Sequence, residues 1–349
     1  MGVAVGDGRR NAPPRLRIRA HRTARSTHAL AVHPLAGWRR ASPYPYHGEA
    51  HIAQSGAAAP MNEPEFQVRR YSGDGGVQLV ADVGGDPSSL PVILMHGGGQ
   101  TRHSWGGAMR ELIRRGYYVI NLDARGHGES DWAPDGDYGF STLARDLERI
   151  IATLSAKPAL VGASMGGATG LILAGTRADP PASALVLVDI VPHVDPKGSA
   201  KIRAFMTSHR DGFASVEEAA EAVRAYNPHR PPPKDHSGLM KNLRRRADGR
   251  LHWHWDPRLI TAADGVEPPL PVAELQRAAD GVRIPTLLVR GLESDIVTDE
   301  GVADLERRIP HAEVFDVAGA GHMVAGDRND AFNQGVFEFL HRHMPVPTR

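Results

Sequence analysis

The chain has 349 residues, of which 41% are hydrophobic and none is cysteine, and its formal net charge is +1. This length is enough to bury a large core in one or two domains. The lack of cysteine excludes disulfides, thiolate metal sites and cysteine nucleophiles, and it fits a reducing compartment. No apolar window has the length of a membrane-spanning helix or the character of a secretory signal, so we expect a soluble, cytoplasmic protein.

Residues 1–60 differ from the rest of the chain in charge. They contain nine arginines, no lysine and two acids, which leaves a net charge of −6 on the remaining residues. We expect this Arg-rich extension to be disordered, because it lacks the apolar periodicity that offsets the entropy of ordering. Three interpretations compete: an organelle transit peptide, a basic tail for nucleic acid or membrane, and a translation start assigned too early. We favour the third, with Met61 as the true start, and expect no nucleic-acid partner.

From Glu65 onward, short apolar or alternating runs alternate with longer helical patterns, which indicates an α/β domain with a mostly parallel sheet. The pattern predicts eight strands, at Phe66–Arg70, Val77–Asp82, Val92–Met95, Tyr117–Leu122, Ala159–Val161, Ala184–Val188, Thr286–Arg290 and Glu313–Val317. It predicts helices between them at Ser104–Arg115, Ser141–Leu154, Met165–Gly175, Asp299–Arg307 and Asn329–His343.

The alternation breaks between residues 191 and 282. This block shows no strong strand, contains helical patterns such as "SVEEAAEAVRAY", and includes the stiff segment "RPPP" and the Trp-rich segment "LHWHWDP". An inserted helical lid fits it better than additional sheet. We therefore expect a core formed by residues 61–190 and 283–349, with a helical cap over 191–282.

The stretch "GASMG" at residues 162–166 follows a predicted strand and begins a predicted helix, which is the context of a Gly-x-Ser-x-Gly nucleophile elbow. Its glycines would let the strand and helix backbones pass closely, so that the Ser164 hydroxyl projects from a strained turn at the carboxyl end of the sheet. Taken alone, the motif also fits a small-residue turn without chemistry.

A serine nucleophile needs a base and an orienting acid further along the chain. Asp295 comes just after the predicted strand in "TLLVRGLESDIV", and His322 lies on the Gly-rich loop of "EVFDVAGAGHMVAG". Each has a simpler explanation, since Asp295 could cap the next helix and His322 is one of 18 histidines. Their order after separate strands favours a Ser164, Asp295, His322 triad.

The loop "LMHGGGQTRHSW" after the third predicted strand suits an oxyanion hole, which needs backbone donors facing the developing charge. We assign the two donors to the N–H groups of Gly98 and Met165. His96 is expected to brace this loop rather than to transfer protons.

These segments, together with "DARGHGES", "RGLESD" and "GAGHM", resemble the α/β-hydrolase superfamily, in the branch with a serine nucleophile and a helical cap. The resemblance implies an α/β-hydrolase fold with an eight-stranded sheet flanked by helices, and it makes the "DARGHGES" turn mainly structural. Three residues, rather than the family's more usual two, separate Gly291 from Asp295. Glu293, which is one of these three residues, is therefore an alternative acid. Asp189, at the end of the sixth predicted strand, is a further alternative, because some relatives place the acid there.

The resemblance leaves several activities open. Relatives that attack alkyl carbons use an aspartate at the position of Ser164, so the serine favours acyl chemistry. We expect a serine hydrolase of carboxylic esters that acts on a small-molecule acyl substrate without a cofactor. Perhydrolysis of the cofactor-free haloperoxidase type and carbon–carbon bond hydrolysis use the same triad. A non-catalytic ligand receptor is the alternative from another class.

The segment "HWHWDP" at residues 252–257 imitates a metal motif, but no further ligand falls at metal-site spacing, so we predict no metal. Trp253 and Trp255 either line the acyl pocket or form the core of the lid.

Overall fold

A computed structural model describes residues 64–226, 235–261, 271–322 and 330–346, all within one compact unit. The predicted disordered segment 1–60 and the proposed start at Met61 lie outside these residues.

All eight predicted strands form, and together they make one twisted sheet. The strand order is β1-β2-β4-β3-β5-β6-β9-β10; β1 and β2 pair antiparallel with their neighbours and the other strands are parallel. The central parallel strands β3, β5 and β6 are apolar and buried because helices cover both faces. The strands are β1 Phe66–Ser72, β2 Gln78–Gly84, β3 Pro91–Met95, β4 Tyr118–Asp123, β5 Ala159–Ala163, β6 Ala184–Val188, β9 Thr286–Gly291 and β10 Glu313–Val317.

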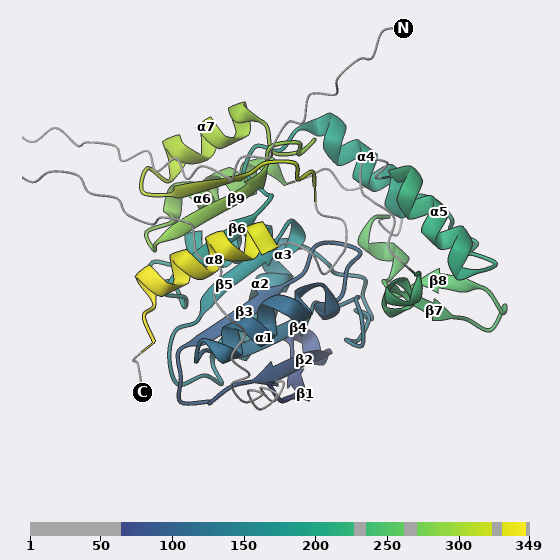
Figure 1. Cartoon of the computed structure of the whole chain (residues 1–349), viewed down its shortest axis with the longest axis horizontal. Helices are drawn as coiled ribbons and strands as arrows, with labels where there is room; N and C mark the ends of the chain where they lie inside the picture. The colour runs from purple at the N-terminus through teal and green to yellow at the C-terminus, as the bar shows by residue number, and fades with distance from the viewer. Residues whose placement is uncertain (1–63, 227–234, 262–270, 323–329, 347–349) are drawn as a thin grey trace, which may run out of the picture. The chain divides into compact units, whose positions relative to one another are not determined.

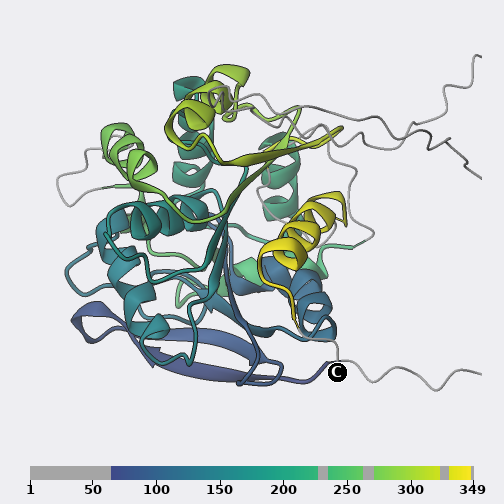
Figure 2. The same cartoon turned by 90° about the vertical axis from the view of Figure 1, so that its left-hand side faces the viewer.

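The helices lie on both faces of the sheet (Figures 1 and 2). Helices α2, α3, α6 and α7 bury their apolar sides in one core layer, and α1 and α8 bury theirs in the other. None of the helices in the described residues is long and apolar enough to cross a membrane. Their bounds are α1 Gly106–Arg114, α2 Phe140–Ile151, α3 Met165–Gly175, α6 Val272–Gly281, α7 Asp299–Arg308 and α8 Asp330–His343, and the short 3-10 turns are η1 Asp74–Gly76 and η2 Arg102–Trp105.

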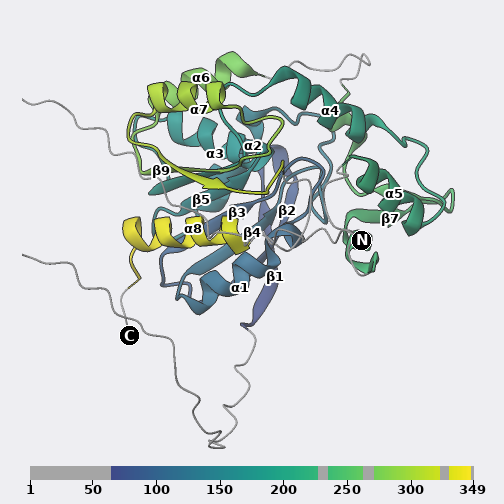
Figure 3. The same ribbon diagram turned by 45° about the horizontal axis from the view of Figure 1, so that its top comes forward.

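The segment between β6 and β9 holds the expected helices, but also a small antiparallel hairpin that the sequence analysis missed (Figure 3). The hairpin packs with α4 and α5 around Phe213, Leu251 and Trp253. It corrects the expectation of a purely helical insertion. These elements are α4 Pro196–Thr207, α5 Val216–Tyr226, η3 Ser237–Asn242, β7 Leu243–Arg245, β8 Leu251–Trp253 and η4 Pro257–Leu259.

Helix α6 corrects the boundary predicted at residue 282. Its residues Leu275, Ala278 and Ala279 belong to the same buried core as α3. The two helices approach so closely that a Cβ at Gly175 would lie 1.9 Å from the carbonyl oxygen of Ala278. The core therefore resumes at α6, and the insertion ends before it.

Buried ion pairs fix the loops at the carboxyl edge of the sheet. The Arg102 guanidinium pairs with Asp82, Asp123 and Glu129. Arg125 pairs with Asp146 at 2.6 Å, with both side chains almost fully buried. Since unpaired buried charges are costly, these pairs hold the loops after β3 and β4 in one arrangement. The "DARGHGES" turn thus has the structural role expected of it.

Candidate active site

Ser164 occupies a strained corner between β5 and α3. Its φ is 45° and its ψ is −112°, values that non-glycine residues seldom adopt. Such strain is typical of functional sites, where the surrounding structure enforces it. The backbone N–H of Ser164 donates to the carbonyl of Val188 at 3.0 Å, which ties the corner to the end of β6.

The glycines around Ser164 are required by close backbone contacts. A Cβ at Gly162 would lie 2.3 Å from the carbonyl carbon of Gly166, and a Cβ at Gly166 would lie 2.6 Å from the Cβ of Met95. Neither contacting atom can move aside, because one is the backbone carbonyl carbon of Gly166 and the other is the Cβ of the buried Met95 side chain. This is the steric arrangement predicted for a nucleophile elbow.

His322 is paired with Asp189. The Nδ1 of His322 lies 2.7 Å from the Oδ2 of Asp189, and their side chains are 6% and 1% exposed. A carboxylate only accepts, so Nδ1 carries the proton and Nε2 is the free base nitrogen. Asp189 follows β6 directly and has a φ of 51°, a second strained position in this site.

Asp295 does not contact His322, which corrects the predicted triad. Its carboxylate pairs with Lys201 of α4 at 2.9 Å, and its side chain is 36% exposed. Glu293, the other alternative on this loop, is exposed. Of the three candidate acids, Asp189 is the one next to the imidazole.

The strand order explains why Asp189 reaches His322. Strand β6 lies between β5 and β9, and Val188 stands level with Ala163 and Val289 in the register. Residues that follow these parallel strands therefore meet at one edge of the sheet, where open α/β folds place their ligand sites. A polar residue directly after the buried strand "ALVLV" was the sequence signal for Asp189.

The predicted oxyanion donors lie side by side. A Cβ at Gly98 would lie 3.9 Å from the Cβ of Met165, which is the first residue of α3. Within the described residues, neither backbone N–H donates a hydrogen bond. The flanking amides are occupied: Gly97 N–H donates to the Oε1 of Gln100 at 3.0 Å and Gly99 N–H donates to the Nε2 of His127 at 3.1 Å. The amides of Gly97 and Gly99 thus hold the loop in place, and the N–H of Gly98 stays available to bind an oxyanion.

Three buried histidines brace this loop from behind. The rings of His96 and His127 lie 4.9 Å apart, and those of His127 and His254 lie 5.9 Å apart. The Nε2 of His96 accepts the N–H of Ala124 at 3.0 Å while its Nδ1 donates to the carbonyl of Gly97 at 2.8 Å. His96 therefore braces the loop, as expected. His127 belongs to the "DARGHGES" turn, for which a structural role was expected, whereas the contact of His254 with this loop was not predicted.

His254 connects the hairpin segment to the core. Its Nδ1 accepts the N–H of Gly128 at 2.7 Å, and its Nε2 is buried beside the Gly99 carbonyl without a well-formed hydrogen bond. Burial lowers the pKa of all three histidines, to about 3 for His254. The imidazole of His96 and the charge of Arg244 lower the pKa of His254 further, whereas Asp123 opposes the shift. The cluster is therefore neutral at physiological pH.

We predict that this cluster makes the protein acid-sensitive. Below about pH 6.5 these histidines bind protons in the unfolded state but stay neutral in the native state. The free energy of unfolding is therefore highest above that pH and falls as the pH drops. His254, with a native pKa of about 3, should lower the stability by about 1.4 kcal/mol between pH 7.5 and 5.5, and His96 and His127 should act in the same direction. In urea denaturation, the loss of unfolding free energy between pH 7.5 and 5.5 should therefore be about 1.4 kcal/mol smaller for His254→Asn than for wild type. This variant keeps an acceptor for the Gly128 N–H. Equal slopes in both proteins would contradict the assignment.

The two tryptophans of "HWHWDP" have different surroundings. Their rings stack at 4.9 Å and both side chains are buried. Trp253 packs edge-on against Phe213 inside the insertion. The ring of Trp255 lies 3.2 Å from where a Cβ of Gly99 would be, so it contacts the loop after β3. The prediction that they line a pocket is untested for both, and the geometry favours Trp255.

His252 and Asp256, the polar residues at either end of the same segment, form structural contacts. His252 pairs with Asp248 at 2.7 Å. The carboxylate of Asp256 accepts the hydroxyl of Tyr138 at 2.5 Å and caps η4. The first contact lies within the hairpin, and the Tyr138–Asp256 hydrogen bond joins the insertion to the core.

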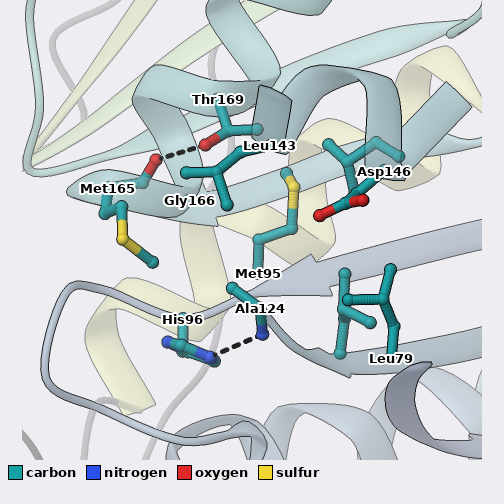
Figure 4. Close-up of a pocket in the computed structure, with 11 residues that line it drawn as sticks. Leu79, Met95, His96, Ala124, Leu143, Asp146, Met165, Gly166 and Thr169 are labelled. Atoms are coloured by element: carbon teal, nitrogen blue, oxygen red, sulfur yellow. Dashed lines mark hydrogen bonds between the residues drawn. The ribbon is translucent and has the colours of Figure 1, made fainter. Parts of the chain in front are cut away.

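A small cavity lies behind the loop (Figure 4). Its volume of about 20 Å³ suits roughly one water molecule, and it is lined mainly by apolar atoms. Met165 and His96 form one side of it, and Leu143 and Asp146 lie across from them. The cavity therefore has room for a small solvent molecule, and we assign no substrate to it.

Comparisons with known proteins agree with this architecture. The model of the family described as alpha/beta hydrolase fold matches residues 91–328. An esterase of Mycobacterium tuberculosis is 30% identical over 284 residues, covering 79% of this chain and 90% of its own. An sn-1-specific diacylglycerol lipase of Mus musculus is 28% identical over 267 residues, covering 73% and 82%. A crystal structure of the mycobacterial esterase matches with a TM-score of 0.61 over 80% of this chain and 92% of that one.

The family model spans more than half of the chain, including Ser164, Asp189 and His322. The sheet order, the strained serine between β5 and α3, and the paired histidine agree with it. The chain belongs to the α/β-hydrolase family and is a hydrolase.

Proposed function

We propose that this hydrolase cleaves carboxylic esters through an acyl-enzyme on Ser164, with a triad of Ser164, His322 and Asp189. The observation that carries the proposal is the buried His322–Asp189 pair at the strand ends next to a strained serine. The relatives support the ester class, because one is an esterase and another a diacylglycerol lipase.

In the first step, the Nε2 of His322 takes the proton of Ser164 as Oγ attacks the ester carbonyl. Asp189 holds Nδ1–H and stabilises the imidazolium. The oxyanion accepts hydrogen bonds from the N–H groups of Gly98 and Met165, each worth about 3 kcal/mol of barrier. His322 then protonates the leaving alkoxide, and an alcohol departs.

In the second step, water replaces the alcohol. His322 removes a proton from the water as its oxygen attacks the acyl carbon, and the same backbone donors hold the second oxyanion. The bond to Ser164 Oγ breaks, His322 returns the proton to Oγ, and a carboxylic acid leaves. The chain's own groups complete this cycle, so it needs no cofactor.

The surroundings of the oxyanion loop favour an apolar substrate group. The Cε of Met206 on α4 lies 4.0 Å from where a Cβ of Gly98 would be and 3.4 Å from that of Gly99. Trp255 and Met165 flank the same glycines. We propose that Met206 and Trp255 contact the acyl or alcohol part, whereas Trp253 supports Trp255 from behind.

Perhydrolysis and carbon–carbon hydrolysis use the same three groups, so the substrate panel should include peroxide with acetate and a vinylogous diketone. A non-catalytic receptor is disfavoured, because binding alone gives no reason to keep a buried His322–Asp189 pair beside a serine at a nucleophile elbow.

The test is pre-steady-state hydrolysis of p-nitrophenyl acetate, butyrate and octanoate. An acyl-enzyme mechanism predicts an initial burst of p-nitrophenol that approaches one equivalent per chain wherever deacylation is slower than acylation. Acid-quenched samples should carry the acyl group on the peptide that contains Ser164. Acylation of a residue other than Ser164, or no turnover of any panel member by folded protein, would refute the proposal.

A further inference from the structure

The carboxylate of Asp189 has a further hydrogen-bond donor besides His322. The hydroxyl of Ser294 donates to Oδ2 at 2.8 Å, the same oxygen that accepts from His322 Nδ1. The backbone N–H of Gly291 donates to Oδ1 at 3.3 Å. The carboxylate side chain is 1% exposed, so these protein groups replace the water that would otherwise solvate it.

Ser294 is itself held in place. Its Oγ accepts the N–H groups of Ile296 and Val297, at 3.3 and 3.2 Å, in the turn after β9. Two incoming amide protons leave the hydroxyl hydrogen directed elsewhere, and Asp189 is the acceptor at hydrogen-bond distance. Because a charge-assisted hydrogen bond is directional, this contact fixes the rotation of the carboxylate that His322 uses.

We propose that Ser294 is a positioning residue for the triad, which orients Asp189 toward His322. This inference depends on the function proposed above. It assigns a role in turnover to a loop whose acids, Glu293 and Asp295, point elsewhere.

Ser294→Ala should lower kcat by about tenfold with KM changed less than about twofold, because a lost charge-assisted bond affects the charged transition state most. Ser294→Thr keeps the hydroxyl and should remain within about threefold of wild type. Thermal melts of each variant check the fold, since Ala also removes the acceptor for Ile296 and Val297.

A relocation experiment separates positioning from simple support of the turn. Ser294 Oγ is 2.8 Å from Asp189 Oδ2, and an aspartate side chain reaches one bond further than serine. Asp189→Gly empties the carboxylate site and suits the positive φ of 51°. Adding Ser294→Asp to that variant puts a carboxylate within reach of His322 Nδ1 and keeps an acceptor for the turn amides.

The double variant D189G/S294D should turn over at least about tenfold faster than D189G. Two results would overturn the inference: Ser294→Ala with kcat within twofold of wild type, or a double variant no faster than D189G. Fluorophosphonate labelling of the wild type distinguishes a failure of the proposed function from a failure of the role of Ser294. A wild type that neither labels nor turns over defeats the proposed function, whereas a labelled wild type with unaffected S294A defeats only the role of Ser294.

Discussion

Asp189→Asn is expected to lower kcat by about 10⁴-fold with little change in KM. The neutral amide would no longer stabilise the imidazolium of His322, and its NH₂ would favour the wrong imidazole tautomer. Asparagine tolerates a positive φ nearly as well as aspartate, so the fold should survive. Steady-state kinetics on the best ester of the panel, with circular dichroism of both proteins, measure the effect.

Asp295→Asn is the matched control, because it makes the same chemical change on the neighbouring loop. It removes one partly exposed ion pair with Lys201, which is worth about 0–1 kcal/mol. Its kcat should stay within about twofold of wild type. The reverse pattern, with Asp295→Asn inactive and Asp189→Asn active, would restore the acid that the motif spacing suggested and refute the pairing seen in the structure.

Ser164→Ala should abolish turnover, with kcat lower by about 10⁶-fold, because no other group takes over covalent attack. Ser164→Gly should be equally inactive but more stable than Ser164→Ala by about 1 kcal/mol, since glycine removes the strain of a φ of 45°. Urea denaturation of the two inactive variants measures this difference in their free energies of unfolding. A glycine variant less stable than the alanine variant would argue against strain at this corner.

The sequence predicted the sheet because its signals are local. Each strand is a short apolar run between turn residues, and the range predicted for the helix after Ser164, Met165–Gly175, matches α3. The hairpin was missed although its signal was present. Asp248–Gly249 separates two short runs, and Gly249 has a φ of 79°, as a tight hairpin turn requires.

The acid of the triad was predicted wrongly, as Asp295, because the prediction used only the residues near one strand end. Counting from Gly291 with the family's more usual spacing lands on Ser294, and the next residue, Asp295, was the nearest carboxylate. Which carboxylate meets His322 depends on the sheet order, in which β6 lies beside β9. That adjacency is tertiary, so Asp189 stayed only an alternative until the strands were placed. His254 was unpredictable for the same reason, since its partner Gly128 lies 126 residues away.

The proposed mechanism requires that Ser164 is a nucleophile and that His322 activates it. Reaction of the wild type with a fluorophosphonate, followed by peptide mass spectrometry, measures this without knowledge of the natural substrate. We predict stoichiometric modification at Ser164, no modification of Ser164→Ala, and labelling of Asp189→Asn that is far slower than that of Asp295→Asn. A folded wild type that stays unmodified, or is modified at another serine, would contradict the central claim.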